Sequence, residues 1–180
     1  MKSRLIAILA TLASIPCHAE IEWRDFEITS YEDKPQFTLG NYTCGLRAIK
    51  DPQRDRGESL ELIVRDENMK EAKESFTSSY GMVSFAIDGD LLLIKYGTGR
   101  GTCVRTEHVR VFKIGDSLTK LGEFPVSYWH NTAGAAEAAD PERFEATLDL
   151  KREGTSAVLS ITYPQASPER PPDLAVKIGP

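Results

Sequence analysis

Cysteine thiols and histidine imidazoles are few in this chain, which has three of each. Cys44 and Cys103 lie 59 positions apart, and two thiols fall short of the four nitrogen or sulfur ligands of a structural zinc site. We expect no metal site and no cofactor. If the chain is exported, this even pair predicts one disulfide, Cys44–Cys103, which would add about 4 kcal/mol to the free energy of unfolding. Two buried reduced thiols are the alternative.

Nucleophilic catalysis finds little support in the sequence. No Gly-x-Ser-x-Gly elbow occurs, and Gly115-Asp116-Ser117 is typical of a hairpin turn. A catalytic triad would need His108 or His130, and neither lies in a sequence typical of a strained turn. We therefore expect no catalytic residue and no enzyme activity, although the 27 acidic residues leave room for a glycosidase-like pair of carboxylates.

A glycine-rich loop, Gly97-Thr98-Gly99-Arg100-Gly101, precedes Cys103. A dinucleotide-binding fingerprint would need glycine at position 102 and a helix after it, but Thr102 stands there and no helix is predicted. The loop instead predicts a tip that presents Arg100 to a partner. The alternative is a hairpin connection that only reverses the chain.

Tyr128-Trp129-His130-Asn131 places two large aromatic rings, an imidazole and an amide within four residues. Aromatic side chains dominate binding hot spots and also stack on sugar rings, so Trp129 and His130 are predicted to contact a partner. The alternative is that Tyr128 or Trp129 closes the core at a strand end. His108, by contrast, is predicted on the outer face of a strand, among charges that pair across the sheet.

The N-terminal segment has the features of a secretory signal. Lys2 and Arg4 precede an apolar run over 5–15, and the small residue Ala19 suits cleavage by signal peptidase. We expect residues 1–19 to be removed, which places the mature protein in the periplasm or outside the cell. Lipidation at Cys17 is the alternative, although Pro16 beside it fits a lipoprotein signal poorly.

Charge and length limit the partners. Loss of residues 1–19 removes two positive charges and no acid, so the formal charge moves from −5 to −7. The remaining chain, 20–180, suits a single β domain. A negative field disfavours nucleic acid and anionic membrane surfaces and speeds encounter with a cationic partner, although it also serves plain solubility. No later segment is apolar enough to span a membrane.

Apolar side chains recur with a period of two almost throughout, which is typical of half-buried strands. The clearest hairpin joins 83–87 to 90–96 through Asp88-Gly89, and another is predicted to turn at Arg152-Glu153-Gly154. The consecutive apolar residues 91–94 predict a central strand covered on both faces. Helix is scarce, with two turns predicted over 67–76. The remaining strands are predicted at 21–28, 42–49, 60–65, 109–114, 118–124, 144–150, 157–163 and 174–178. We predict an all-β fold, an antiparallel sandwich or open barrel of about ten short strands with little helix.

Three predicted loops, 50–57, 131–142 and 164–172, are the places to look for a binding surface. The leading hypothesis is an exported, non-catalytic binding protein that inhibits, or gives immunity against, a wall-degrading enzyme or toxin. Its predicted partner contacts are Arg100, Trp129 and His130. A carbohydrate-binding or envelope-associated module is the alternative, and a hydrolase of unrecognised type is a third hypothesis. The sequence leaves the oligomeric state open.

Overall fold

The chain folds entirely as β-structure in the part that the computed structural model describes, which is residues 18–19, 21–27, 29–30, 36–49, 58–78, 83–98, 104–130, 142–154, 156–164 and 172–179. The predicted all-β class is confirmed. The strands are β1 (His18–Ala19), β2 (Arg24–Asp25), β3 (Thr29–Ser30), β4 (Phe37–Leu39), β5 (Tyr42–Ile49), β6 (Glu58–Arg65), β7 (Glu71–Ser78), β8 (Val83–Asp88), β9 (Leu91–Thr98), β10 (Val104–Ile114), β11 (Leu118–His130), β12 (Glu142–Glu145), β13 (Thr147–Glu153), β14 (Ser156–Thr162) and β15 (Leu174–Ile178).

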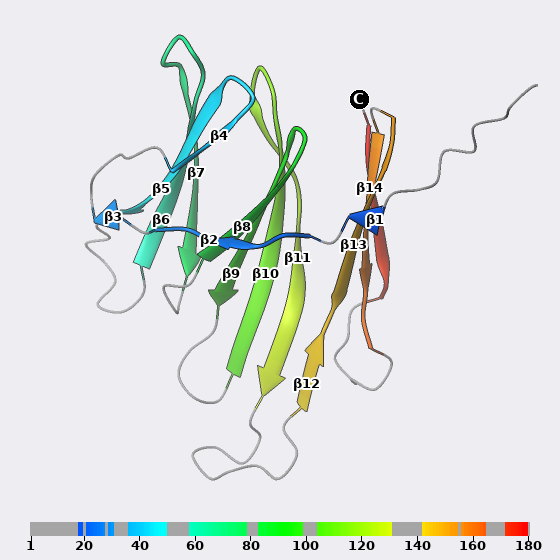
Figure 1. Ribbon diagram of the computed structural model, residues 1–180. Helices are drawn as coiled ribbons and strands as arrows, with labels where there is room; N and C mark the ends of the chain where they lie inside the picture. The colour runs from blue at the N-terminus through cyan, green and yellow to red at the C-terminus, as the bar shows by residue number, and fades with distance from the viewer. Residues whose placement is uncertain are drawn as a thin grey trace, which may run out of the picture.

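These strands form three sheets (Figure 1). The central sheet has the order β12-β11-β10-β9-β8-β2, and the C-terminal sheet has the order β1-β13-β14-β15. The N-terminal sheet has the order β3-β5-β6-β7, with β4 also paired to β5. Neighbouring strands are antiparallel except β3 and β5, which are parallel. The central sheet lies between the other two, so both of its faces are covered over much of their area.

Strand β9 shows why the central sheet is buried on both sides. Leu92 and Ile94 belong to the core shared with the N-terminal sheet, whereas Leu91 and Leu93 belong to the core shared with the C-terminal sheet. All four are at most 1% exposed, and burial of each stabilises the fold by about 1.5–3 kcal/mol. The run of apolar residues predicted a central strand covered on both faces, and this prediction is confirmed.

The predicted hairpin turns are also confirmed. Gly89 follows β8 with a φ of +58°, and Gly154 follows β13 with a φ of +64°. Both lie in the left-handed region, which glycine enters without steric cost. At Gly89 a second constraint acts, because the Arg152 guanidinium packs where a Cβ atom would lie. Arg152 donates from Nε to Asp88 Oδ2 over 2.6 Å and from Nη2 to Asp90 Oδ1 over 3.2 Å, and so ties the C-terminal sheet to this turn.

The predicted helix over 67–76 is wrong. Asp66 instead forms a tight turn, with its Oδ1 accepting hydrogen bonds from the amides of Asn68 and Lys70. Met69 in this turn has a φ of +63°, which no right-handed helix allows. β7 then pairs with β6 over its whole length. Every second side chain of β7 is more buried than its neighbours, up to Phe76 and Ser78. This strand pattern overrides the local helix propensity.

Several predictions fall on residues outside the described part of the chain. These are Arg100, Cys103, Asn131, the predicted loop 50–57 and most of the loops 131–142 and 164–172. The strand β1 comprises the last two residues of the predicted export signal and pairs with Lys151 and Leu150. Cleavage after Ala19 would remove β1 and leave β13 at the edge of its sheet. Within the described residues, no helix has the length and apolar character needed to cross a membrane.

Candidate functional site

A groove of about 310 Å³ opens between the central sheet and the start of the C-terminal sheet. It is the strongest candidate site because it brings together charged, hydroxyl and aromatic side chains from strands that are distant in the sequence. Its lining residues are Ile21 and Trp23 before β2, Lys95 of β9, Glu107 of β10, Val126 and Ser127 of β11, Glu145 of β12, Ala146, and Leu148 of β13.

Strand register sets the spacing of the polar groups in this groove. Glu107 lies opposite Ser127, and Ser127 lies opposite Glu145 on its other side. Neighbouring strands are about 4.8 Å apart, so the backbones of the two glutamates are separated by about 10 Å with the serine between them. Residues directly opposite one another project from the same face of a sheet. The two carboxylates therefore flank one hydroxyl in a single row.

Trp23 and Lys95 form the other polar part of the groove. The Lys95 ammonium lies 4.7 Å from the centre of the Trp23 ring, within the range of a cation–π interaction. Across the residues that the structure describes, neither the Glu107 nor the Glu145 carboxylate forms a hydrogen bond or an ion pair. The groove thus offers carboxylate oxygens that retain their acceptor capacity. No group of three metal-ligating side chains occurs within the described ranges.

Trp129 lies in the next row along the same strands. It pairs with Arg105 of β10 and Arg143 of β12, and the Arg105 guanidinium lies 5.7 Å from the centre of its ring. His130 ends β11, where its ring lies edge-on to Tyr128 at 6.2 Å. The structure therefore brings the predicted contacts Trp129 and His130 to one end of β11, next to the groove.

Tyr128 is partly buried and packs against the core between the central and C-terminal sheets. Its ring stacks on Phe144 at 5.7 Å, and Phe144 in turn contacts Tyr163 edge-on at 5.4 Å. Phe144 and Tyr163 are both buried. The alternative that an aromatic residue of this segment closes the core is thus correct for Tyr128.

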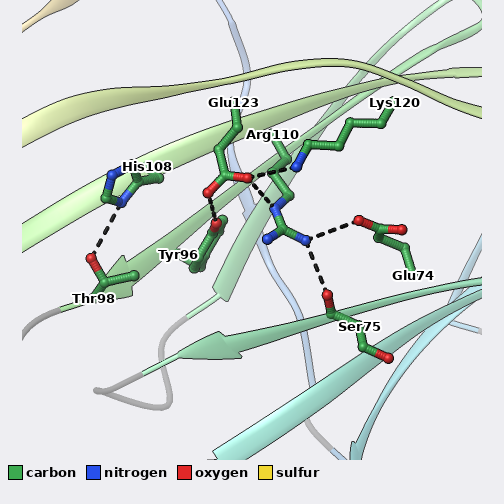
Figure 2. Close-up of polar contacts among 8 residues, drawn as sticks. All are labelled: Glu74, Ser75, Tyr96, Thr98, His108, Arg110, Lys120 and Glu123. Carbon is green, nitrogen blue, oxygen red and sulfur yellow. Dashed lines mark hydrogen bonds and ion pairs between the residues drawn. The ribbon is translucent and has the colours of Figure 1, made fainter.

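A second polar cluster lies on the opposite face of the central sheet and centres on Glu123 (Figure 2). This carboxylate accepts hydrogen bonds from Tyr96 Oη at 2.5 Å, from Arg110 Nε at 2.8 Å and from Lys120 Nζ at 2.7 Å. Partial burial alone would raise the pKa of Glu123, but the hydrogen bonds from Lys120 and Tyr96 and the charge of Arg110 lower it to about 2. Glu123 is therefore ionised over the whole physiological range.

Arg110 extends this cluster to the N-terminal sheet. Its Nη1 donates to Glu74 Oε1 over 3.2 Å and to the Ser75 carbonyl over 3.1 Å, both on the edge strand β7. The guanidinium also lies 5.4 Å from the ring centre of Phe76 and 5.3 Å from that of Tyr96. Arg110 thus joins two sheets, and the cross-strand charge pairing predicted for this strand is present between Arg110 and Glu123.

Burial shifts the pKa values of two titratable groups beside Glu123. Burial and the hydrogen bond to Glu123 raise the pKa of Tyr96, so its hydroxyl stays protonated. Burial also lowers the pKa of His108, whose Nδ1 lies 3.3 Å from Thr98 Oγ1. His108 is half-buried beside the Tyr96 ring rather than on an outer face, so that prediction is wrong. The cluster stabilises the junction of two sheets.

Cys44 is a free cysteine in the structure and is fully buried in the core between the N-terminal and central sheets. Burial raises the pKa of its thiol to about 12, which makes it unreactive in the folded protein. Cys103 lies outside the described residues, so the predicted Cys44–Cys103 disulfide is not seen. The observed state of Cys44 is that of the alternative, a buried reduced thiol.

Sequence reasoning missed the groove itself. Trp23, Lys95, Glu107 and Glu145 come from four separate segments, and only strand register brings them together. Comparisons with known proteins give no match to this chain, whether with family models, with curated proteins or with solved structures.

Proposed function

We propose that this chain is an exported, non-catalytic binding protein that docks on another protein and antagonises it, as an inhibitor of a wall-degrading enzyme or a toxin does. The observation that carries the proposal is the groove and its surroundings at one end of β10–β12. Glu107 and Glu145 lie there beside Trp23 and one row from Trp129, and neither carboxylate has a hydrogen bond or ion pair among the described residues. Aromatic and charged side chains gathered at one place are typical of binding hot spots.

Net charge supports a cationic partner. The formal charge is −7 once residues 1–19 are removed, and electrostatic steering raises association rates between oppositely charged proteins. Enzymes that attack acidic wall polymers are often basic, because a basic surface holds them on their substrate. An acidic antagonist would be steered onto such enzymes.

The use of the polar groups supports a non-catalytic role. The Glu123 carboxylate accepts three hydrogen bonds, one of them from the Tyr96 hydroxyl, and Cys44 is buried. A general acid, base or nucleophile needs a group that is accessible and poised to exchange a proton. These three groups are instead committed to stabilising the fold.

Carbohydrate binding is the second candidate function, favoured by Trp129 and Trp23 near one groove. One face of each indole is occupied, by Arg105 and by Lys95 respectively, which leaves less aromatic surface for a sugar ring. Sedimentation with purified wall polymer separates the two functions. An antagonist of an enzyme should remain in the supernatant, whereas a carbohydrate-binding module should pellet.

Capture and inhibition together test the proposed function. The purified protein should retain a basic secreted protein from a periplasmic or extracellular extract and should inhibit that protein's activity. Trp129→Ala and Arg100→Ala test the predicted contacts, and Glu67→Gln, on the exposed β6–β7 turn, is the matched control. Retention and inhibition that are unaffected by both contact variants would remove Trp129 and Arg100 from the site.

Export is tested separately. Expressed with its own N-terminus, the protein should be found in the periplasmic or extracellular fraction, with Glu20 as its first residue by intact mass. A lipid-modified Cys17 would show as a larger mass and a membrane-bound product. Full-length protein in the cytosol would contradict the export proposal.

A further inference from the structure

We infer that the groove binds one cationic side chain, a lysine or arginine of the partner, with its charged head between Glu107 and Glu145. This inference rests on the proposed function and adds the chemistry of the group that is recognised. The groove volume of about 310 Å³ is at the lower end of small-ligand sites and exceeds what a single long side chain needs.

The two walls of the groove match the two parts of such a side chain. Lysine and arginine carry an apolar stem and a charged head, and they bury the stem while the head stays hydrated. Ile21 and Leu148, both partly exposed, supply apolar surface for the stem. Glu107 and Glu145 supply acceptors for the head, and Ser127 between them supplies a neutral acceptor.

Charge complementarity favours this occupant. Two carboxylates and one ammonium leave the groove with one net negative charge, which an incoming cation neutralises. Neither carboxylate has a hydrogen bond or an ion pair within the described part of the chain, so a cation gains these acceptors without breaking an internal bond. An anionic ligand would meet both carboxylates, and a wholly apolar one would leave them unpaired.

Lys95 already places one cation in the groove, against the Trp23 ring. Its ammonium lies 4.7 Å from the Trp23 ring centre, and its positive charge opposes the entry of a second cation. Removal of a negative and of a positive charge from the groove should therefore have opposite effects on binding. Removal of a carboxylate should weaken binding of a cationic side chain, whereas removal of the Lys95 charge should strengthen it.

The test needs no identified partner. Nα-acetyl-arginine amide is titrated into the ¹⁵N-labelled protein, with Nα-acetyl-citrulline amide as the neutral probe of nearly equal shape. The shift of the Trp23 indole N–H signal, assigned with Trp23→Phe, reports occupancy of the groove. We expect binding in the millimolar range for the arginine probe, with no saturable shift from the citrulline probe.

Variants then test the assigned roles. Glu107→Gln and Glu145→Gln should each weaken binding of the arginine probe by about fivefold, and Lys95→Gln should tighten it by about twofold. Glu67→Gln and Lys177→Gln, at exposed sites on other strands or turns, are the charge-matched controls and should change nothing. The backbone amide spectrum of each variant shows whether it is folded.

Three outcomes would overturn the inference. They are no shift of the Trp23 signal, equal binding of the neutral probe, and binding that is indifferent to Glu107→Gln and Glu145→Gln. Any of these leaves the proposed function to be judged by capture and inhibition, which use the partner protein. Conversely, arginine binding without capture of any partner would support the groove chemistry and count against the antagonist role.

Discussion

Replacement of Glu123 by Gln should destabilise the protein strongly at neutral pH and hardly at all near pH 2. Glu123 accepts hydrogen bonds from Tyr96, Arg110 and Lys120, and its side chain is only 29% exposed. A glutamine keeps the shape and one acceptor oxygen, but it removes the charge that pairs with Arg110 and Lys120. The lost stability is therefore electrostatic in origin and must follow the titration of the carboxyl.

The magnitude follows from the pKa of Glu123. Its folded-state pKa of about 2 lies below the ordinary value of 4.5, so the unfolded chain binds a proton more readily than the folded one. This stability is fully present above pH 4.5 and is lost as the pH falls toward 2. The full shift is worth about 3 kcal/mol, and solvent screening at a partly exposed site reduces it to about 2 kcal/mol.

Urea unfolding at a series of pH values between 7 and 2 measures this difference. The variant should unfold at a lower urea concentration at pH 7, and the two midpoints should converge at the acid end. Glu67→Gln, which removes an exposed carboxylate from a turn, should stay within about 0.5 kcal/mol of the wild type throughout. A constant offset between wild type and Glu123→Gln at every pH would refute the electrostatic explanation.

Three further predictions follow from single sites. Met69→Gly should raise the free energy of unfolding by about 0.5 kcal/mol. Glycine removes the steric cost of a φ of +63°, and its greater entropy in the unfolded chain offsets only part of that gain; a lowered urea midpoint would contradict this. Arg152→Ala should lower it by about 1–2 kcal/mol through loss of the contacts to Asp88 and Asp90, and an unchanged thermal midpoint would count against that role. Cys44 should resist iodoacetamide in the folded protein and react after denaturation without reductant, by peptide mass; a thiol that reacts only after reduction would restore the disulfide hypothesis.

Much of the fold follows from local patterns in the sequence. The turns at Gly89 and Gly154 were predictable because positive φ angles favour glycine, and each turn fixes the register of its hairpin. The burial of β9 on both faces was predictable because four consecutive apolar residues leave no polar face. Such features depend on a few adjacent residues and on elementary sterics.

The predicted helix over 67–76 failed because a tertiary partner overrode local preference. Its charged and small residues suit a helix, but β6 offers a complete set of backbone hydrogen bonds to β7. The strained Met69 turn makes this pairing possible. The prediction that His108 lies on an outer face failed for a similar reason. Alternation of charged and apolar residues did not reveal that the N-terminal sheet leaves this face of β10 half-buried rather than exposed.

The candidate site was only partly predictable. Trp129 and His130 were identified because large aromatic and polar residues are adjacent in the sequence, and the structure places them beside the groove. Glu107 and Glu145 were not, because their proximity depends on the pairing of β10, β11 and β12. The register between β10 and β11 depends on two bulges, between Glu107 and His108 and between Val111 and Phe112. No local sequence motif predicts them.

The central claim, that the groove end of the central sheet binds a protein partner, is tested most directly by quantitative capture with the double variant Glu107→Gln/Glu145→Gln. The wild-type protein and the Glu67→Gln control should retain the same basic secreted protein and inhibit its activity, and the double variant should lose both. Equal retention and inhibition by the double variant would contradict the claim, as would the absence of any retained protein from extracts of the native compartment.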